Sequence, residues 1–374
     1  MPLEVKKAET PADLKSFVVF PWKVYSPESL WVPPLISERV QFISRRKNPF
    51  FKQAEVDFYL AVDEKGKTMG RIAFILDHHH NEYQKDNAGF FGMFECVEDS
   101  KVANLLLDKV FEQCKSKGLT QMMGPMNLST NHECGLLVEG FDTPPMIGMP
   151  YNPPHYADFF DDWGLRKAKD LVSLKFTPTK IPEYLERAMG LVTKRNRFTL
   201  RCLDMNRFEE ELETIWEVYN SAWSRNWGFV PMTREEFIFS AKDMKSIVNP
   251  ELCMIAEVKG EAVAFALTLP NINQILKPLN GSLFPFGWLK FLLNKKKIDT
   301  WRIVTLGVKK EYQKLGIDVA FFHEIYRLML VHRLRMSEMS WILEDNTAMI
   351  KPIQRVGGTL YKKHRIYERA CQTE

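Results

Sequence analysis

The feature that most constrains the fold is an internal repeat, first seen as two hairpin-like segments. Residues 59–76 and 253–269 each consist of two β-like runs joined by a Lys-Gly turn. Such a turn between two β-like runs is typical of a β-hairpin. The turn glycines, Gly66 and Gly260, lie 194 positions apart. The chain therefore contains the same supersecondary element twice, at long range.

A second shared feature follows each hairpin at nearly the same spacing. Residues 164–176 and 357–369 each read as a glycine, a basic stretch and a strand, and their starts lie 193 positions apart. Two unrelated features at one offset indicate a duplicated unit, and units of this length are domains rather than the turns of a solenoid. The sequence therefore predicts two tandem domains, at 1–177 and 196–374, joined by a linker at 178–195.

Both repeats show the same order of elements. A short strand and an amphipathic helix precede the hairpin, and a strand, a long helix and a further strand follow it. In the second repeat these last three are expected at 302–312, 319–335 and 338–346. Strand–helix–strand crossovers beside hairpins give a mixed sheet with helices on its faces, so the predicted fold class is α/β.

Composition excludes several classes of protein. The chain has 374 residues, 45% of them apolar and 26% charged, with a net charge of +4. That charge is too small to indicate a nucleic-acid partner. The six cysteines show no metal-ligand spacing, so no metal is expected, and the first residues lack the apolar core of a signal peptide. We expect reduced thiols in a cytoplasmic protein.

One segment is rich in apolar residues without being long enough to span a bilayer. Residues 281–297 read GSLFPFGWLKFLLNKKK and are interrupted by Pro285, Gly287 and Lys290. Aromatic residues followed by three lysines would suit contact with a membrane surface. A lid or an inter-domain contact explains them as well, and it is the favoured interpretation.

The stretch at 305–325 predicts an anion site. It reads as an apolar run, a charged turn with Gln313 and Gly316, and a helix. A strand that ends in a tight turn and opens a helix leaves several backbone N–H groups directed at one point, and such helix N-termini hold phosphates. Gly316 would let the backbone approach the ligand closely.

This turn and the order of elements resemble the GNAT superfamily of acyl-CoA-dependent N-acyltransferases. The family signature, Gln/Arg-x-x-Gly-x-Gly/Ala, corresponds here to residues 313–318. The resemblance covers nearly the whole chain as two tandem GNAT-like domains, and its specific part is 303–369. It implies that the second domain binds acetyl-CoA or another acyl-CoA. The implied contacts are Leu306, Gly307, Val308, Gln313, Lys314, Leu315, Gly316, Ile317, Asp318 and Asn346.

Asp318 departs from the family pattern, because a carboxylate beside a pyrophosphate is repelled by it. Two unit charges about 4 Å apart repel by roughly 4 kcal/mol at an effective dielectric constant near 20. In the first turn of a helix, however, an acidic side chain also complements the helix dipole. We expect the Asp318 side chain to point outward while its N–H faces the ligand.

The resemblance also directs the choice of catalytic residues. Transfer to an amine needs a base for the amine proton and an acid for the leaving thiolate. Glu344, at the end of a strand, is the candidate base, although Glu344 and Asp345 fit a helix N-cap cluster nearly as well. The tyrosine that often serves as acid in the family corresponds to Ile353 here. Tyr361 is the candidate acid, with Tyr367 also downstream.

The first repeat lacks the glycine turn and carries an extra loop. After its central strand comes SKVANLL, without a glycine, so it should not bind a pyrophosphate. The loop at 132–156 is long for a compact domain, and such loops are usually functional. We expect it to shape the acceptor site through Glu139, Asn152 and Tyr156. A structural role in packing the two domains together explains the loop equally well.

The predicted function is N-acyl transfer, such as acetyl transfer, from acyl-CoA to the amine of a small molecule or peptide. Two alternatives stay open. One is a non-catalytic binding or scaffold protein, favoured by Asp318 and the missing tyrosine. The other is a transferase similar to the Fem type, which takes aminoacyl-tRNA; the Gln313–Gly316 turn favours coenzyme A over this donor. The acyl chain, the amine and the oligomeric state stay open too.

Overall fold

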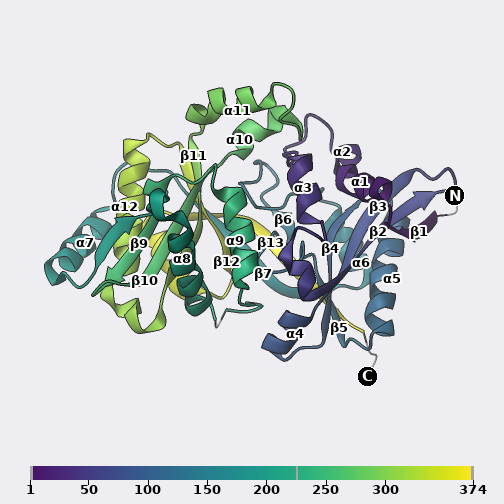
Figure 1. Ribbon diagram of the computed structural model, residues 1–374, viewed down its shortest axis with the longest axis horizontal. Coiled ribbons are helices and arrows are strands. Elements are labelled where there is room, and N and C mark those ends of the chain that lie inside the picture. Colours follow the sequence, from purple (N-terminus) through teal and green to yellow (C-terminus); the bar gives the residue numbers. More distant parts are fainter. Residues whose placement is uncertain (1–2, 225, 372–374) are drawn as a thin grey trace. The chain divides into compact units, whose positions relative to one another are not determined.

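Two units, each a mixed α/β structure, make up the chain in the computed structural model, which describes residues 3–224 and 226–371 (Figure 1). The first unit takes in the segments up to residue 171, 275–293 and the segment from residue 362 onward. The second takes in 172–274 and 294–361. Each unit is described separately below.

The first unit is built on a sheet whose strands follow the chain in the order β1-β2-β3-β4-β5. The β4–β5 pair is parallel and the other neighbours are antiparallel. The bounds are β1 (Leu3–Lys7), β2 (Ala54–Asp63), β3 (Thr68–Asp77), β4 (Ala88–Cys96) and β5 (Gln121–Gly124).

Helix α5 (Ser100–Ser116) provides the crossover from β4 to β5. Its side chains at 102, 106, 110 and 114 are fully buried in the core beneath the sheet, and Asp99 caps its first turn by accepting from the N–H of Lys101. This helical spacing is the amphipathic pattern seen in the sequence. The other helices of this part of the chain are α1 (Pro11–Val19), α2 (Pro21–Val24), α3 (Ile36–Phe42), η1 (Pro49–Lys52), α4 (His78–Gln84) and α6 (Tyr156–Trp163).

The second unit repeats this plan. Its strands run in the order β8-β9-β10-β11-β12, and β11–β12 is the parallel pair. The bounds are β8 (Thr199–Cys202), β9 (Cys253–Val258), β10 (Glu261–Pro270), β11 (Thr300–Val308) and β12 (Met336–Leu343).

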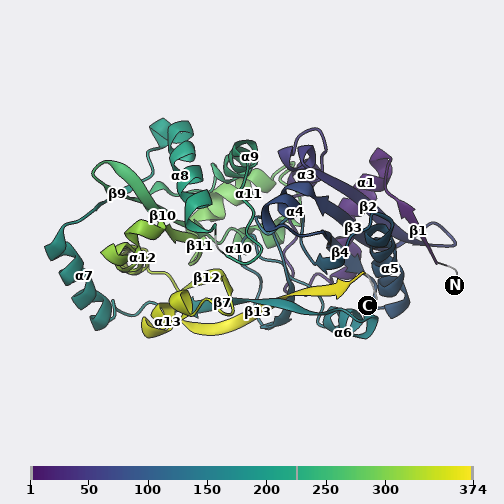
Figure 2. The same ribbon diagram turned by 90° about the horizontal axis from the view of Figure 1, so that it is seen from below.

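Helices cover both faces of the second sheet (Figure 2). Helix α12 (Ile317–Val331) and helix α7 (Glu183–Arg195) pack on the face that carries Ala264 and Ala266 of β10. Helix α8 (Phe208–Ala222) and helix α9 (Arg234–Met244) pack on the face that carries Phe265. The remaining short elements are η2 (Met205–Arg207), η3 (Pro250–Leu252), α10 (Asn273–Leu276), η4 (Lys277–Leu279), α11 (Gly287–Asn294), η5 (Lys295–Lys297), η6 (Lys310–Leu315) and α13 (Thr347–Arg355).

The duplicated mixed-sheet fold predicted from the sequence is confirmed. Gly66 and Gly260 sit in the turns of the β2–β3 and β9–β10 hairpins with φ of 74° and 83°, conformations that glycine adopts without strain. Gly164 and Gly357, with φ of 99° and 94°, precede β7 (Arg166–Phe176) and β13 (Thr359–Ala370).

The two structural units do not contain the same strands as the predicted domains at 1–177 and 196–374. Residues 367–370 of β13 pair with β5, and residues 363–365 pair with β6 (Leu136–Glu139), so the end of the chain belongs to the first unit. The end of β7, by contrast, places its side chains at 172, 174 and 176 in the core of the second unit.

Candidate active site

Strands β11 and β12 pair along only part of their length. Their parallel pairing runs from Thr300 opposite Met336 to Ile303 opposite Met339. Beyond these rungs β11 continues to Val308 and β12 to Leu343 with no further pairing between them among the described residues. The two strands therefore splay apart toward their carboxyl ends.

A β-bulge stands where the splay begins. Leu267 of β10 lies opposite Thr305, and the next residue, Thr268, lies opposite Ile303, so Val304 is the extra residue. A bulge bends its strand and often ends pairing on one side. From Ile303 to Val308 the open edge of β11 is about 17 Å long, at roughly 3.4 Å per residue. An unpaired edge of this kind accepts an extended chain through its backbone N–H and C=O groups.

Gly307 in this open stretch is required for packing on one side of the sheet. A β-carbon at this position would lie 2.1 Å from the ring of Trp223, which follows α8. Leu306 and Val308 point to the opposite side, into the core beneath α12. Their predicted contact with a cofactor would therefore be made by the backbone.

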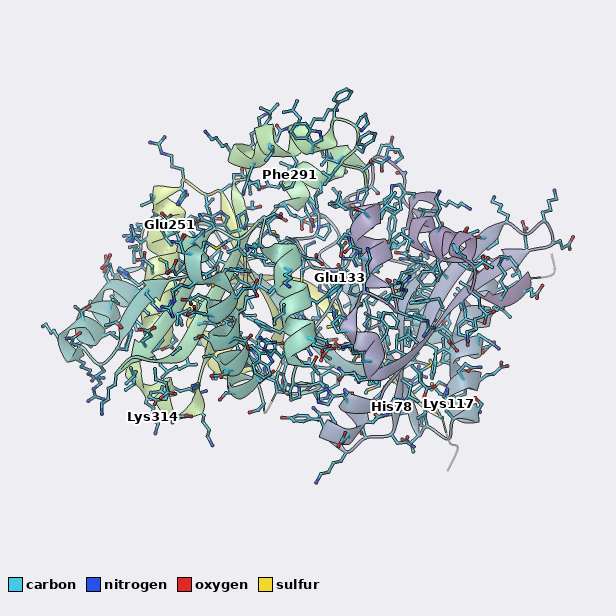
Figure 3. The ribbon with its side chains drawn as sticks, viewed as in Figure 1. His78, Lys117, Glu133, Glu251, Phe291 and Lys314 are labelled. Atoms are coloured by element: carbon cyan, nitrogen blue, oxygen red, sulfur yellow. The ribbon has the colours of Figure 1, made fainter. Side chains whose placement is uncertain are left out.

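The open end of the splay meets the N-terminus of α12. β11 leads through η6 to Gly316, whose φ is +81°, and α12 begins at Ile317. The Gln313 side-chain amide donates to the carbonyl of Val308, 3.5 Å away, and Lys314 on this turn is exposed (Figure 3). The strand–turn–helix expected from the sequence is thus present, and the first N–H groups of a helix have no carbonyl partner within it.

Val192 of α7 packs against the predicted anion site at residues 314–318, which we call the cradle. Its Cγ2 lies 2.7 Å from the place where a β-carbon on Gly316 would be. α7 runs beside α12, and His323 lies 3.3 Å from the carboxylate of Glu186. Gly316 therefore serves the packing of this helix as well as the turn.

Asp318 is partly buried rather than pointing freely outward. Burial raises the pKa of this carboxyl, and hydrogen bonds from the backbone N–H groups of Val319 and of Asp318 itself oppose the rise. The carboxylate therefore lies over amides of the first turn, as the helix-dipole interpretation requires. These are also amides that a bound phosphate would use.

A buried polar cluster lies at the closed end of the splay. Glu338 of β12 is fully buried and accepts short hydrogen bonds from the hydroxyls of Tyr361 and Ser340. The Nε of Arg302 donates to Ser340 Oγ at 2.9 Å, and its Nη2 donates to the Ser340 carbonyl at 3.1 Å. Arg302 lies directly opposite Glu338 in the β11–β12 ladder. A buried carboxylate is tolerated only with such partners.

The cluster contains one of the two predicted catalytic residues. Tyr361 binds Glu338, and the ammonium of Lys175 lies 4.9 Å from the centre of its ring. Glu344 lies in the turn after β12, and Asn346 caps α13 by accepting from the Met349 N–H at 3.2 Å. Their roles stay predictions.

Sequence reasoning missed Glu338. Its signal was an acidic residue inside an otherwise apolar strand, where a charge is costly without a function or a partner. The acidic residues predicted to act, Glu344 and Asp345, lie instead at the end of that strand.

The first unit has the same splay, but its own chain fills it. β4 and β5 pair in parallel only from Ala88 opposite Gln121 to Phe90 opposite Met123. The segment after β5 then returns to β4. The Met126 N–H donates to the carbonyl of Phe91 at 2.7 Å.

Asn127 completes this internal plug. Its side-chain oxygen accepts from the N–H of Met93 at 2.7 Å. A β-carbon on Gly92 would lie 1.8 Å from the Met126 carbonyl oxygen, so the segment is pressed against β4. The backbone edge that is open in the second unit is therefore occupied here. This agrees with the missing glycine turn after β4.

A small polar cavity of about 60 Å³ lies beside this plug, with Arg71, Glu95, Asn127 and Asn152 in its wall. Burial raises the pKa of Glu95 to about 7, although the charge of Arg71 and hydrogen bonds from two tyrosines oppose the rise. The Tyr25 hydroxyl donates to Glu95 at 3.0 Å.

The three predicted acceptor-site residues lie in different surroundings. Asn152 lines the cavity, and its amide is bound to the backbone of Leu137. Tyr156 is fully buried and donates to Glu95 at 3.0 Å. Glu139 is exposed and forms an ion pair with Lys363. Their assignment to an acceptor site stays a prediction.

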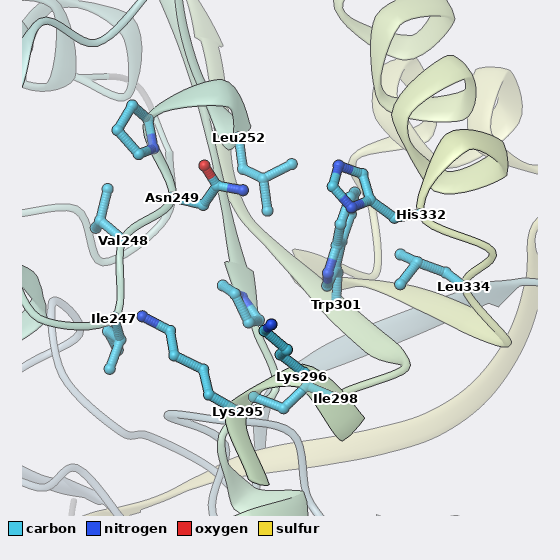
Figure 4. A pocket seen from close by; sticks show the side chains of 12 residues that line it. Ile247, Val248, Asn249, Leu252, Lys295, Lys296, Ile298, Trp301, His332 and Leu334 are labelled. Carbon is cyan, nitrogen blue, oxygen red and sulfur yellow. The ribbon is translucent and has the colours of Figure 1, made fainter. Parts of the chain in front are cut away.

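A cavity of about 520 Å³ in the second unit lies away from the cradle (Figure 4). Trp301, His332, Leu334 and Lys295 are among its lining residues. His332 follows the C-terminus of α12, a 15-residue helix, whereas the cradle is at its N-terminus. The helix is about 22 Å long at 1.5 Å per residue, so this cavity is separate from the pyrophosphate site.

Residues 3–224 and 226–371 contain neither a cluster of metal ligands nor a membrane-spanning helix. No group of three or more His, Cys, Asp or Glu side chains is arranged to hold a metal ion. No helix in these ranges has both the length and the apolar character needed to cross a bilayer.

Known proteins resemble the chain in sequence and in structure. It is 38% identical to the bacterial ceramide synthase of Caulobacter vibrioides, over 98% of this chain and 97% of that protein. It is 37% identical to Protein YghO of Escherichia coli, over 96% of this chain and 93% of that protein. No family model matches the sequence.

Solved structures share the tandem fold. A tandem GNAT protein from the clavulanic acid biosynthesis pathway covers all of this chain, and is itself fully covered, with a TM-score of 0.56 and 10% identity. The chain therefore has the tandem GNAT fold, and it belongs to the same family as the bacterial ceramide synthase and Protein YghO. A GCN5-related N-acetyltransferase from Sphaerobacter thermophilus also shares the GNAT fold, with a TM-score of 0.52 over 99% of this chain and 96% of that one, at 12% identity.

Proposed function

We propose that the protein transfers the acyl group of an acyl-CoA to the amine of a long-chain amino alcohol. The observation that carries the proposal is the asymmetry of the two splays. The one between β11 and β12 is open, whereas Met126 and Asn127 fill the equivalent one in the first unit. An N-acyltransferase needs one such edge to hold the extended arm of its donor.

The residues around the open splay fit an acyl-CoA. The amides of residues 314–318 would hold the pyrophosphate where α12 begins, once the Asp318 carboxylate has turned away from the N–H groups of Asp318 and Val319. The unpaired edge of β11 from Thr305 to Val308 would hold the pantetheine arm. The hydroxyl oxygen of Thr305 is buried without a hydrogen-bond partner, so a polar group of the arm would satisfy it. When bound, the thioester supplies an activated acyl group.

Glu338 and Tyr361 would move the proton. The amine must lose one proton as its nitrogen bonds to the acyl carbon, and the departing thiolate must gain one. Tyr361 is only partly buried, while Glu338, to which its hydroxyl donates, is fully buried, and the proposal requires that the amine reach the Tyr361 oxygen. The phenol oxygen would take the amine proton as its own proton passes to Glu338. The same pair would then return the proton to the thiolate, which balances the reaction.

The choice of acceptor rests on the relative named a ceramide synthase, which is 38% identical over nearly its full length. A ceramide is the amide of a fatty acid with a long-chain amino alcohol. A long acyl chain is therefore preferred over the acetyl group that the GNAT resemblance alone implies. We place this reaction in the cytoplasm, where acyl-CoA is available.

The test incubates the purified protein with acyl-CoAs from acetyl to long-chain, together with a long-chain amino alcohol, and follows the amide by mass spectrometry. We expect amide with long-chain donors and none without protein. If amide forms with acetyl-CoA but not with long-chain acyl-CoAs, the donor would be acetyl-CoA and not a long-chain acyl-CoA. If coenzyme A does not bind at all, the scaffold and aminoacyl-tRNA alternatives are favoured instead.

A further inference from the structure

The segment at 275–297 carries an apolar surface that faces outward. Phe284, Phe286, Trp288, Leu292 and Leu293 are all exposed, with exposed fractions between 53 and 85%. Leu289 is exposed to 42%. A run of large apolar side chains this exposed on a folded domain marks an interaction surface. We call residues 284–293 the apolar face.

Helix α11 is turned so that its apolar side faces solvent. Trp288, Leu289, Leu292 and Leu293 recur at the spacing of one helical side. Phe291, on the other side, is more protected than its neighbours, and side chains project outward around it (Figure 3). In a helix that packs on its own core, the apolar side would be the buried one. A lid or packing contact would likewise bury these side chains.

The apolar face has a fixed support. The Nε1 of Trp22 donates to Asn280 at 2.9 Å, and the ammonium of Lys277 donates to the Ser29 carbonyl at 2.6 Å. The Ile36 N–H donates to the carbonyl of Gly281 at 3.0 Å. These bonds hold the base of the segment on the first unit.

The charged residues within the segment itself have one sign. Residues 275–298 contain five lysines and no acidic residue. Lys296 and Lys297 are exposed and follow the end of α11 directly. Apolar aromatic and leucine side chains beside lysines match the interfacial layer of a bilayer that contains anionic lipid, where apolar groups enter the acyl boundary and lysines meet the headgroups.

We infer that the apolar face docks the protein on the surface of an anionic lipid bilayer. Docking goes beyond acyl transfer and does not depend on it. It would bring the chain to a surface where long-chain amphiphiles concentrate. Lys295 and Lys296 also line the 520 Å³ cavity of the second unit.

The test is sedimentation of the full chain with vesicles of phosphatidylcholine alone or mixed with phosphatidylglycerol. We expect stronger binding to the mixed vesicles, weakened by salt. Trp288→Ser with Leu292→Ser should lower partitioning at least tenfold, because two large side chains no longer leave water. Lys296→Gln with Lys297→Gln should lower it about fivefold for each lysine, on anionic vesicles only.

A matched control uses apolar side chains exposed elsewhere. Val40→Ser with Val331→Ser removes two side chains that are 46% and 62% exposed, and should leave partitioning unchanged. Equal partitioning of the parent and the Trp288 variant, or of the control and the Trp288 variant, would overturn the inference. A concentration-dependent dimer that the Trp288 variant loses, without vesicle binding by the parent, would assign the face to a second copy instead.

Discussion

At the scale of single residues, each unit has a buried glutamate that accepts hydrogen bonds from hydroxyl groups. Glu338 sits at the closed end of an open splay with Tyr361 and Ser340 as donors. Glu95 sits beside a filled splay with Tyr25 and Tyr156 as donors. A carboxylate stripped of water stays in place only with such donors, and at Glu95 burial raises the pKa to about 7.

The first prediction concerns the proposed proton path. Tyr361→Phe removes the hydroxyl that links an amine to Glu338 and should lower kcat about 10²–10⁴-fold, as expected when a proton-transfer group is lost. KM for acyl-CoA should change little, because the cradle is at the other end of the splay. The measurement is steady-state kinetics by product mass spectrometry, with Glu324→Gln, a partly exposed residue paired with Arg327, as control. A similar loss in Glu344→Gln, with Tyr361→Phe near parental activity, would move the base to Glu344.

The second prediction concerns the stability contributed by Glu95. Its pKa is about 7 in the folded protein and 4.5 without burial. Between these values the folded state keeps a proton that the unfolded state releases. The free energy of unfolding should therefore fall by about 3 kcal/mol as the pH rises from 4.5 through 7. Urea unfolding of the parent and Glu95→Gln should show this fall in the difference between them; an exposed-site variant, Glu98→Gln, should not differ from the parent. A constant difference between the parent and Glu95→Gln would contradict the assignment.

At the scale of elements, the two splays differ in what occupies the strand edge that each leaves unpaired. In the second unit Val304 is the extra residue, and the edge beyond it stays open. In the first unit Asn127 and Met126 return to pair with the freed edge. The same fold thus gives one ligand-binding edge and one self-filled edge, with no change in strand order.

The third prediction separates the two roles of Gly316. A side chain there meets Val192 and strains a backbone with φ of +81°, so Gly316→Val should lose both stability and affinity for coenzyme A. Gly260→Val is the matched control, because Gly260 has φ of +83° and no heavy atom within 4 Å. It should lose similar stability from strain alone and keep its affinity. Calorimetry measures the affinity for coenzyme A, and thermal midpoints measure the stability. If Gly316→Val binds coenzyme A with parental affinity, the pyrophosphate site is not at this turn.

At the scale of the whole molecule, the duplication could be predicted from the sequence because turn glycines with positive φ recur at nearly the same spacing. The strand–turn–helix at 305–325 could also be predicted, because a glycine marks the turn and a helical pattern follows it. The final strands of the two repeats were not readable in the same way. Nothing local in residues 362–370 says that they pair with β5, because pairing partners are set by long-range packing. The Asn127 plug was missed for the same reason, whereas Glu338 did have a local signal, an acidic residue inside a predicted strand.

The last prediction is that one chain binds one molecule of coenzyme A. The open edge and the cradle occur together in the second unit, whereas the first unit fills its edge with Met126 and lacks the glycine turn. Titration calorimetry of the parent should give a stoichiometry of one, and Gly316→Val should abolish that event. Asn127→Ala removes the hydrogen bond to Met93 and should lower stability without adding a second event, because the first unit still has no cradle for the pyrophosphate. Two equivalent binding events in the parent would show that the plug yields to ligand, and the division of labour between the units would then be wrong.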